Sequence, residues 1–234
     1  MPDAVTLVTG AAGALGMRLA KDLLACGDCV ILVDQERQRK SLEALEAAHP
    51  GRLQIRCFDA ASEADWAGVV PELESQFGPI AGCALIAGGW AGGGTVYETD
   101  VLDSMLTMNL RTVNAALRAV LPSMVSRAEG AVVVVGSRAA ERPWESAGAA
   151  AYASAKAGVV ALAQAAAAEV LPKGVRINAV LPSIIATAAN RQAMPGADAS
   201  RWVSTESLSH VIRFLLSDAA RDISGAALPV YGRV

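Results

Sequence analysis

Tyr152 and Lys156 are the side chains in this sequence whose types and spacing best suit chemistry. They lie in an alanine-rich segment that favours a helix, and a spacing of four residues places both on one helix face, about one turn apart. A phenol, with a pKa of about 10, is a better proton donor when a nearby cation favours the phenolate. The pair therefore suits acid–base catalysis, although the same spacing is common in surface pairs without a catalytic role.

A glycine- and alanine-rich turn near the N-terminus suits a different task, the binding of a phosphate group. The run Thr9–Gly16 follows an apolar segment and precedes a helical pattern. Glycines allow a tight turn and close approach of the backbone to a pyrophosphate, and a helix N-terminus offers unpaired N–H groups to that anion. An ordinary strand-to-helix turn is the alternative. The candidate dinucleotide-binding residues are Gly10, Ala12, Gly13, Ala14, Leu15 and Gly16.

Two aspartates follow the second and third apolar runs. Asp34 lies about twenty residues after the glycine turn, where a carboxylate can accept hydrogen bonds from the ribose hydroxyls of an adenosine. Its charge also repels a 2′-phosphate, so we expect NAD(H) to be preferred, with NADP(H) possible because Arg37 and Arg39 lie nearby. Asp59 is a candidate acceptor for the adenine amino group. Capping of the following helix is the alternative for both aspartates.

Strand and helix patterns alternate along the whole chain. Short apolar, β-branched runs predict strands at Val5–Thr9, Cys29–Asp34, Leu53–Phe58, Ile80–Ala87, Ala131–Ser137, Val175–Leu181 and Ala226–Tyr231. Helical patterns cover Ala14–Ala25, Glu36–Ala48, Ala64–Phe77, Val101–Ser126, Ala149–Leu171 and Thr205–Leu216. Near-continuous apolar strands separated by amphipathic helices indicate a parallel sheet covered on both faces. We therefore expect an α/β fold of the Rossmann type, a doubly wound, seven-stranded parallel sheet with helices on both faces.

One domain, residues 1–234, is expected, because no internal repeat, charge block or Pro/Gly/Ser-rich linker marks a boundary. Pro195 and Gly196 interrupt the periodicity of the segment Ser183–Ser204, which follows the sixth predicted strand. Loops at the carboxyl ends of strands form the ligand crevice of a doubly wound sheet. This segment is therefore expected to be a substrate lid.

Composition narrows the class of partner. The formal net charge of -3 and the lack of a Lys/Arg-rich block argue against nucleic acid and anionic membranes and favour a small-molecule substrate. The first residues show no secretory signal pattern, and the apolar stretch Ala157–Val170 is too short and too polar to span a bilayer, so a cytoplasmic location is expected. No metal site is expected, since two histidines accompany only four cysteines, Cys26, Cys29, Cys57 and Cys83.

The order of these motifs resembles the short-chain dehydrogenase/reductase family over nearly the full length of the chain. The shared features are the glycine turn, the aspartate after the second strand, a Ser…Tyr-x-x-x-Lys set and an Asn-x-x-x-Pro…Thr segment. The resemblance implies an NAD(P)-dependent oxidoreductase. In it, Tyr152 is the acid/base, Lys156 is its electrostatic partner and a ribose ligand, and Ser137 is a hydrogen-bond donor to the substrate oxygen.

The resemblance extends to further residues. It implies that Asn109 holds a proton-relay water. A strand-end serine that caps a turn is the alternative for Ser137, and Ser146 is a nearby competitor. The cofactor is also expected to contact residues after the fourth and sixth strands, namely Ala87, Gly88, Gly89, Pro182, Ile185 and Thr187.

The chain departs from the common family pattern in the glycine turn and after the fourth strand. Ala14 stands where the turn usually has its middle glycine, and positions 85–90 read Leu-Ile-Ala-Gly-Gly-Trp in place of Asn-Asn-Ala-Gly. Three segments, at 13–16, 87–93 and 190–202, resemble dihydropteridine reductases instead. That resemblance implies reduction of a pterin-like C=N bond, with Trp90 available to stack on the heterocycle. The alternatives are an alcohol or 3-oxoacyl-type reductase and a non-catalytic NAD(P)-binding sensor.

The predicted helix at Ala149–Leu171 also bears on assembly. It is dense in alanine beyond the Tyr152–Lys156 pair, and a face of small residues lets another helix approach closely. We therefore expect a homodimer or homotetramer formed through this helix. Burial of the same face within its own monomer is the alternative.

Overall fold

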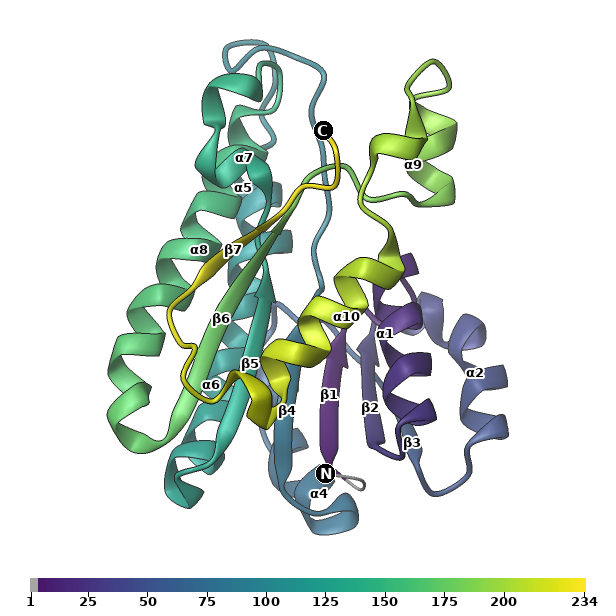
Figure 1. Ribbon diagram of the computed structural model, residues 1–234, viewed down its shortest axis with the longest axis vertical. Coiled ribbons are helices and arrows are strands. Elements are labelled where there is room, and N and C mark those ends of the chain that lie inside the picture. Colours follow the sequence, from purple (N-terminus) through teal and green to yellow (C-terminus); the bar gives the residue numbers. More distant parts are fainter. Residues whose placement is uncertain (1–3) are drawn as a thin grey trace.

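A computed structural model describes residues 4–234 and shows one seven-stranded sheet in which all strands are parallel (Figure 1). The strand order is β3-β2-β1-β4-β5-β6-β7. The strands are β1 (Val5–Thr9), β2 (Cys29–Asp34), β3 (Leu53–Cys57), β4 (Ile80–Leu85), β5 (Gly130–Val135), β6 (Val175–Pro182) and β7 (Ala227–Val230). The order reverses direction between β1 and β4, which is the switch point where a doubly wound sheet opens its ligand crevice. The predicted Rossmann-like α/β fold is confirmed.

Helices cover both faces of the sheet, as Figure 1 shows. The α-helices are α1 (Ala14–Ala25), α2 (Arg39–Ala48), α3 (Glu63–Trp66), α4 (Val69–Phe77), α5 (Leu102–Met105), α6 (Thr112–Arg127), α7 (Arg138–Glu141), α8 (Ala150–Val170), α9 (Ala188–Ala193) and α10 (Thr205–Leu216). A π-helix, η2 (Leu106–Arg111), joins α5 to α6. Short 3-10 turns are η1 (Glu36–Gln38), η3 (Pro143–Glu145), η4 (Leu171–Lys173), η5 (Ala199–Arg201) and η6 (Asp218–Ala220).

Two apolar cores lie on opposite faces of the sheet because successive strand side chains point to opposite sides. Leu7 of β1 packs in the core that includes α4, α6 and α8, whereas the next residue, Val8, packs in the core that includes α1, α2 and α10. All five residues of β1 are buried. A strand covered on both faces of the sheet buries side chains at successive positions, which explains the near-continuous apolar runs of the sequence.

Helix α8 is very apolar throughout. With η4 it forms Ala150–Lys173, which among residues 4–234 is the one helix long and apolar enough by length and composition to cross a membrane. The prediction that the stretch at 157–170 is too short and too polar to span a bilayer therefore does not hold for the whole helix. In this fold it packs against β5 and β6. Helices in the core of a protein can meet the same compositional test, so the apolar composition of α8 does not by itself indicate a membrane span.

Three predicted helices are interrupted. The pattern at 64–77 divides into α3 and α4 at Gly68, whose φ of +80° is left-handed. The pattern at 36–48 begins as the 3-10 turn η1, and the pattern at 101–126 contains η2. Several strands also end earlier than predicted, β4 at Leu85 and β5 at Val135, so the last predicted strand residues belong to the loops of the site.

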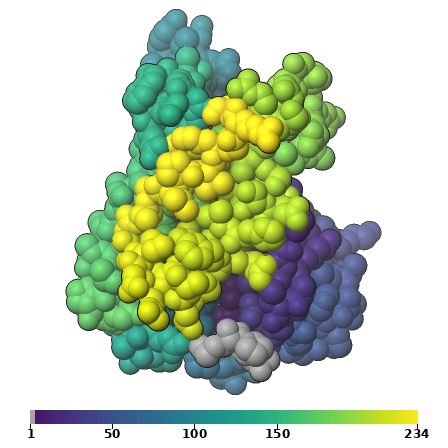
Figure 2. Space-filling model, viewed as in Figure 1, coloured from purple at the N-terminus to yellow at the C-terminus, as the bar shows by residue number. Residues whose placement is uncertain are grey.

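The predicted lid is partly regular. It contains α9 and η5, and its two roots pair through a bridge between Ile185 and Val203. Figure 1 shows α9 standing away from the sheet beyond the carboxyl ends of the strands, with the C-terminus between it and α7. Figure 2 shows the same arrangement on the surface, where the C-terminal residues separate the lid from the region of α7.

Candidate active site

The carboxyl ends of β1 and β4 are held together by the Thr9 hydroxyl. Thr9 Oγ1 accepts hydrogen bonds from the backbone N–H groups of Ile86 and Ala87, both at 3.1 Å. The next residue, Gly10, has a φ of +65°, and a Cβ built on it would lie 2.9 Å from the Ala87 Cα. Position 10 therefore requires glycine, and the glycine turn lies directly against the loop after β4.

The glycine turn leads into α1 without a side-chain cap. Gly13 is the N-cap of this helix, and no side chain accepts a hydrogen bond from its first turn. The first N–H groups of a helix have no partner within it, so those of Ala14 and Leu15 are available to an anion. A Cβ on Gly16 would lie 2.3 Å from the Gly10 carbonyl oxygen. Position 16 therefore has no room for a side chain, and a glycine turn this tight lets a pyrophosphate approach the backbone closely.

Asp34 holds the glycine turn against the end of β2. Its Oδ2 accepts a 2.8 Å hydrogen bond from the Ala12 N–H, and its Oδ1 accepts one from the Gln35 N–H, also at 2.8 Å. The N-cap of the following turn, η1, is Gln35. Asp34 is thus not a helix cap, and its carboxylate lies beside the predicted phosphate-binding turn, which fits a ribose ligand.

Asp59 lies at the end of β3 and is exposed. Its Oδ1 accepts a 3.0 Å hydrogen bond from the Ala61 N–H, and the cap of α3 is Ser62, not Asp59. The structure therefore places Asp59 in a turn at the same edge of the sheet, and contact with adenine stays a prediction.

Asn109, in η2, joins the loop after β4 to the end of α5. It is fully buried, and its Nδ2 donates to the carbonyl oxygens of Gly89 (3.1 Å) and Met105 (3.0 Å), while its Oδ1 accepts from the Gly89 N–H. A Cβ on Gly88 would lie 2.7 Å from Asn109 Oδ1 and 3.4 Å from Lys156 Nζ. Asn109 thus positions Gly88 and Gly89 beside Lys156, and its predicted role in holding a water is not tested by these contacts.

Lys156 is buried, and its Nζ donates a 2.7 Å hydrogen bond to the carbonyl oxygen of Val135, the last residue of β5. The same Nζ lies 6.0 Å from the centre of the Tyr152 ring. Burial penalises the charged form and lowers the pKa of Lys156 to about 8. The predicted phenol–ammonium pair is therefore present at the carboxyl edge of the sheet.

Ser137 and Tyr152 face each other across this edge. Burial raises the pKa of Tyr152, and a hydrogen bond with the Ser137 side chain acts in the opposite direction. Ser137 is also the N-cap of α7, since its Oγ accepts a 3.2 Å hydrogen bond from the Ala139 N–H. The serine thus caps a turn, which was the alternative interpretation, and also contacts the phenol; its donation to a substrate oxygen stays a prediction. The competitor, Ser146, lies in the segment between η3 and α8.

The residues predicted after β6 form the first root of the lid. Pro182 ends β6, and the Ile185 carbonyl oxygen accepts a 2.8 Å hydrogen bond from the Asn190 side chain. The Thr187 hydroxyl caps α9 by accepting from the Asn190 N–H at 3.1 Å. These residues lie at the carboxyl edge, as predicted, and Thr187 keeps its own hydroxyl proton for another acceptor.

Sequence reasoning missed two parts of the site. The Val135 carbonyl oxygen is the partner of Lys156, and a backbone acceptor leaves no signal in residue type. The Thr9 hydroxyl joins β1 to the loop after β4, and the Thr-Gly pair at the start of the turn was the available signal. Exposed aromatic side chains also border this edge, with Trp90 62% and Trp144 75% exposed.

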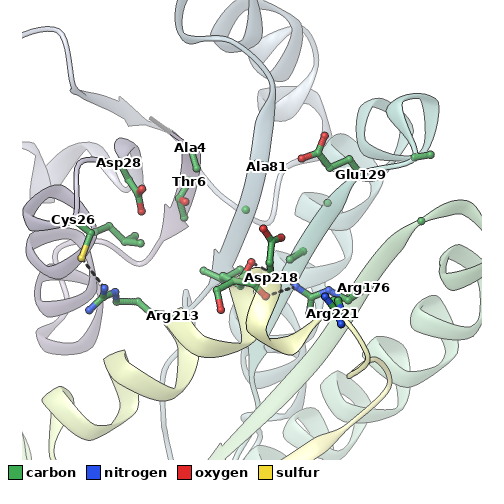
Figure 3. A pocket seen from close by; sticks show the side chains of 18 of the residues that line it. Ala4, Thr6, Cys26, Asp28, Ala81, Glu129, Arg176, Arg213, Asp218 and Arg221 are labelled. Carbon is green, nitrogen blue, oxygen red and sulfur yellow. Dashed lines mark hydrogen bonds between the residues drawn. The ribbon is translucent and has the colours of Figure 1, made fainter. Parts of the chain in front are cut away.

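A separate cavity of about 640 Å³ opens at the opposite edge of the sheet (Figure 3). Its wall includes Ala4 and Thr6 of the first strand segment, Gly82 of β4 and Ala131 of β5, all near the amino ends of these strands. The described lining residues include none of the predicted site residues. This cavity therefore does not mark the site of chemistry, which follows from the side chains at the carboxyl edge.

The cysteines form no site with one another. All four are free, and among residues 4–234 no group of three or more His, Cys, Asp or Glu side chains could hold a metal ion. Cys26 lies instead beside the guanidinium of Arg213, at the wall of the cavity in Figure 3.

Comparison with known proteins decides the family. The family model described as short chain dehydrogenase matches residues 4–197. The chain belongs to the short-chain dehydrogenase/reductase family. It is 28% identical over 250 residues to 2-(S)-hydroxypropyl-CoM dehydrogenase 3 of Xanthobacter autotrophicus (99% of this chain, 96% of the relative). It is also 28% identical over 255 residues to cyclohexanol dehydrogenase of a Rhodococcus species (97% and 94%).

Solved structures of the family agree with this fold. The crystal structure of levodione reductase superposes with a TM-score of 0.89 at 28% identity, covering 99% of this chain and 97% of that one. NAD+-bound xylitol dehydrogenase and an NADPH-bound short-chain oxidoreductase of Pseudomonas aeruginosa each give 0.88 at 26% identity, with coverage of 99% and 98%. This short-chain dehydrogenase is thus an oxidoreductase of a family that binds nicotinamide cofactors, and its glycine turn and Asp34 fit that group.

Proposed function

We propose that this short-chain dehydrogenase uses NAD(H) to interconvert a small carbonyl compound and its alcohol, with Tyr152 as the acid/base. The observation that carries the proposal is the contact between the Tyr152 phenol and the Ser137 hydroxyl beside the buried Lys156 ammonium. These groups share the carboxyl edge of the sheet with the glycine turn, because Gly88 contacts Lys156 and Ala87 contacts Gly10.

Each side chain has a distinct task in this proposal. The glycine turn and Asp34 would hold a nicotinamide cofactor, and such a group would supply or accept the hydride at the substrate carbon. Reduction leaves an alkoxide-like oxygen that needs a proton, and Tyr152 donates it. Ser137 donates a hydrogen bond to the same oxygen as its charge develops, and Lys156 stabilises the phenolate that remains. Since burial raises the pKa of Tyr152 in the free protein, the phenol is protonated and ready to donate at neutral pH.

An uncharged ketone or secondary alcohol fits the site best. The charged side chains nearest to Ser137 along α7 form ion pairs, since Arg138 pairs with Glu145 and Arg142 lies 3.3 Å from the same carboxylate, and the buried Arg138 Nε is the atom among them without a hydrogen-bond partner. Two of the similar proteins are named for alcohols, cyclohexanol and xylitol. We therefore infer a small, uncharged carbonyl substrate.

A pterin-like C=N bond is the second candidate, and Trp90 is the observation that favours it. The indole follows the Gly88–Gly89 turn beside Lys156, and 62% of its surface is exposed. An aromatic face of this kind can stack on a planar heterocycle. The three segments that resemble dihydropteridine reductases support the same substrate class.

A substrate panel tests the proposal. NADH oxidation is followed with cyclic ketones, short aliphatic ketones, a 3-oxoacyl thioester and a quinonoid dihydropterin. Turnover of a ketone that falls at least tenfold in Ser137→Ala supports the main proposal. Preference for the dihydropterin with loss of turnover in Trp90→Ala supports the second candidate. Tight NADH binding without oxidation of any compound contradicts both and favours a cofactor-binding sensor.

We also propose that the molecule forms a homodimer or homotetramer through α8. The outward positions Ser154, Ala157, Ala161 and Gln164 are exposed and small or uncharged, which lets a second helix approach closely. Light scattering should give at least twice the chain mass, and Ala161→Arg should lower it. A wild-type monomer at micromolar concentration contradicts this assembly.

A further inference from the structure

The wall of the site next to Ser137 is a helix too short to hold itself in place. Helix α7 has four residues, and its first turn is capped by Ser137. A single helical turn is not stable alone, because the conformational entropy lost in fixing its backbone outweighs the free energy of its one or two hydrogen bonds. The position of the Ser137 hydroxyl therefore depends on what holds α7 from outside.

Tyr231, just after β7, is the residue that holds α7. Its hydroxyl donates a hydrogen bond to the carboxylate of Glu141, the last residue of α7. The guanidinium groups of Arg138 and Arg142 lie 5.7 and 5.6 Å from the centre of its ring, within the range of cation–π attraction. Both arginines also pair with Glu145. A single aromatic side chain thus contacts the start and the end of the helix.

The backbone around Tyr231 holds the lid. The Ser183 hydroxyl, at the first root of the lid, donates a 2.6 Å hydrogen bond to the Tyr231 carbonyl oxygen. At the second root, the Arg233 N–H donates to the Arg201 carbonyl oxygen at 2.8 Å, and Arg201 Nε donates to the Arg233 carbonyl oxygen at 3.0 Å. Gly232 has a φ of +66°, and a Cβ on it would lie 2.7 Å from the Arg201 carbonyl oxygen.

We propose that residues 231–234 form a clasp that fixes the two walls of the substrate crevice, with Tyr231 as a positioning residue for Ser137. The kinetic part rests on the proposed function. The hydroxyl of Tyr231 holds the α7 side, and the close approach of Gly232 to Arg201 holds the lid side. Figure 2 shows the C-terminal residues lying between these two parts of the surface.

The state of the Tyr231 phenol supports this role. Burial, together with the hydrogen bond to the Glu141 carboxylate, raises its pKa to about 12. The phenol therefore stays protonated and donates across the whole range in which the enzyme is assayed. The charge of Glu141 strengthens the bond, because hydrogen bonds to ionised acceptors are stronger than those between neutral groups.

Two single substitutions separate the two halves of the clasp. Tyr231→Phe removes the hydrogen bond to Glu141, and it leaves both the contacts of the ring with Arg138 and Arg142 and the backbone contacts with the lid. Gly232→Ala forces the backbone away from Arg201 and leaves the Tyr231–Glu141 contact. Tyr97→Phe is the matched control, since Tyr97 is 83% exposed and also loses one phenol hydroxyl.

Kinetics and hydrogen exchange are measured on the same full-length proteins. In Tyr231→Phe we expect kcat for the best ketone to fall about tenfold, because a small displacement of Ser137 weakens its bond to the developing charge. The Kd for NADH should change less than twofold. Amide exchange should speed up in residues 138–149 and stay unchanged in 183–204. Gly232→Ala should show the reverse exchange pattern, and Tyr97→Phe should match wild type.

The hydroxyl–carboxylate contact has its own check. Glu141→Ala should reproduce the kcat of Tyr231→Phe, and the double variant should lose no more than either single one, because both remove the same contact. Wild-type kcat in Tyr231→Phe, or losses that multiply in the double variant, would overturn the positioning role. If no substrate is found, the proposed function fails, and the exchange experiment still decides the clasp: unchanged exchange at 138–149 and 183–204 overturns it.

Discussion

The ammonium of Lys156 donates its 2.7 Å hydrogen bond to the Val135 carbonyl oxygen, at the point where β5 gives way to the loop that carries Ser137. An ammonium has three N–H donors, so this bond orients Nζ and leaves two donors for the phenol side and for a cofactor ribose. The bond also links the helix that carries Tyr152 to the strand that leads to Ser137. The relative positions of the proposed acid and the proposed donor are therefore set by backbone as well as by side chains.

Replacement of the proposed acid should separate binding from chemistry. Tyr152→Phe removes one oxygen and keeps the ring, so NADH binding should stay within about twofold of wild type. Turnover should fall by roughly two to four powers of ten, the usual scale for general acid catalysis. Steady-state kinetics and NADH fluorescence titration measure the two effects. A Phe variant with near wild-type turnover ends the assignment of Tyr152.

The buried ammonium predicts how activity responds to alkaline pH. Burial lowers the pKa of Lys156 to about 8 in the free protein, so its positive charge is present below that pH and is lost as the pH rises through it. Since the charge stabilises the phenolate left after proton transfer, kcat/KM for ketone reduction should fall about tenfold per pH unit above about 8. A profile that stays flat to pH 10 contradicts this role.

Most of the fold was accessible from the sequence because burial on both faces imposes a readable pattern. Strands such as Val5–Thr9 and Cys29–Asp34 have the predicted bounds, since every residue in them faces one of the two cores or ends a strand. The pattern at 64–77 was read as one helix because apolar periodicity continues across Gly68, and the break is a backbone event with a φ of +80°. Apolar periodicity shows which side chains face the core, and it does not show where the backbone interrupts a helix.

The site was accessible where side chains of distinct type do the work. Tyr152, Lys156 and Ser137 carry side-chain chemistry and lie together at the carboxyl edge, and Asp34 lies beside the glycine turn. The π-helix at Asn109 and the role of the Val135 carbonyl oxygen as an acceptor could not be predicted from the sequence. The hydrogen-bond register of a helix and the partner of a backbone carbonyl are both set by tertiary contacts. The clasp at Tyr231 was missed for a related reason, since its partners are separated from it by about ninety positions in sequence.

The charge of Asp34 should govern the choice between NADH and NADPH. Wild type should bind NADH at least about tenfold more tightly, about 1.4 kcal/mol, because the carboxylate repels a 2′-phosphate. Asp34→Asn removes the charge and keeps the oxygen that accepts from the Ala12 N–H, while it loses the bond from the Gln35 N–H. The ratio should then approach one, mainly through tighter NADPH binding. Fluorescence titrations give both constants. Asp222→Asn, a 91% exposed aspartate far from the turn in sequence, is the control. Equal affinities in wild type would refute the assignment.

A buried contact between α1 and α10 should make part of the stability depend on acid pH. Burial by itself would raise the pKa of Asp22, but hydrogen bonds from the Ser209 hydroxyl, at 2.6 Å, and from Arg18 outweigh it, and the pKa is lowered. A carboxyl whose folded pKa is depressed contributes stability that is present above its unfolded pKa of about 3.9 and is lost as the pH falls through the folded value.

Ser209→Ala should therefore lower the free energy of unfolding by about 1 to 2 kcal/mol at pH 7, since it removes a hydrogen bond to a charged acceptor from a fully buried position. The difference should begin to shrink as the pH falls below about 4 and should be lost once the pH is below the lowered folded pKa of Asp22, where the carboxyl is protonated in both proteins. Urea unfolding at several pH values measures it. Ser207→Ala, an exposed serine of the same helix, should change stability by less than about 0.5 kcal/mol at every pH. An effect of Ser209→Ala that is equally large at pH 3 and pH 7 would show that packing, and not the Asp22 charge, is what the hydroxyl supports.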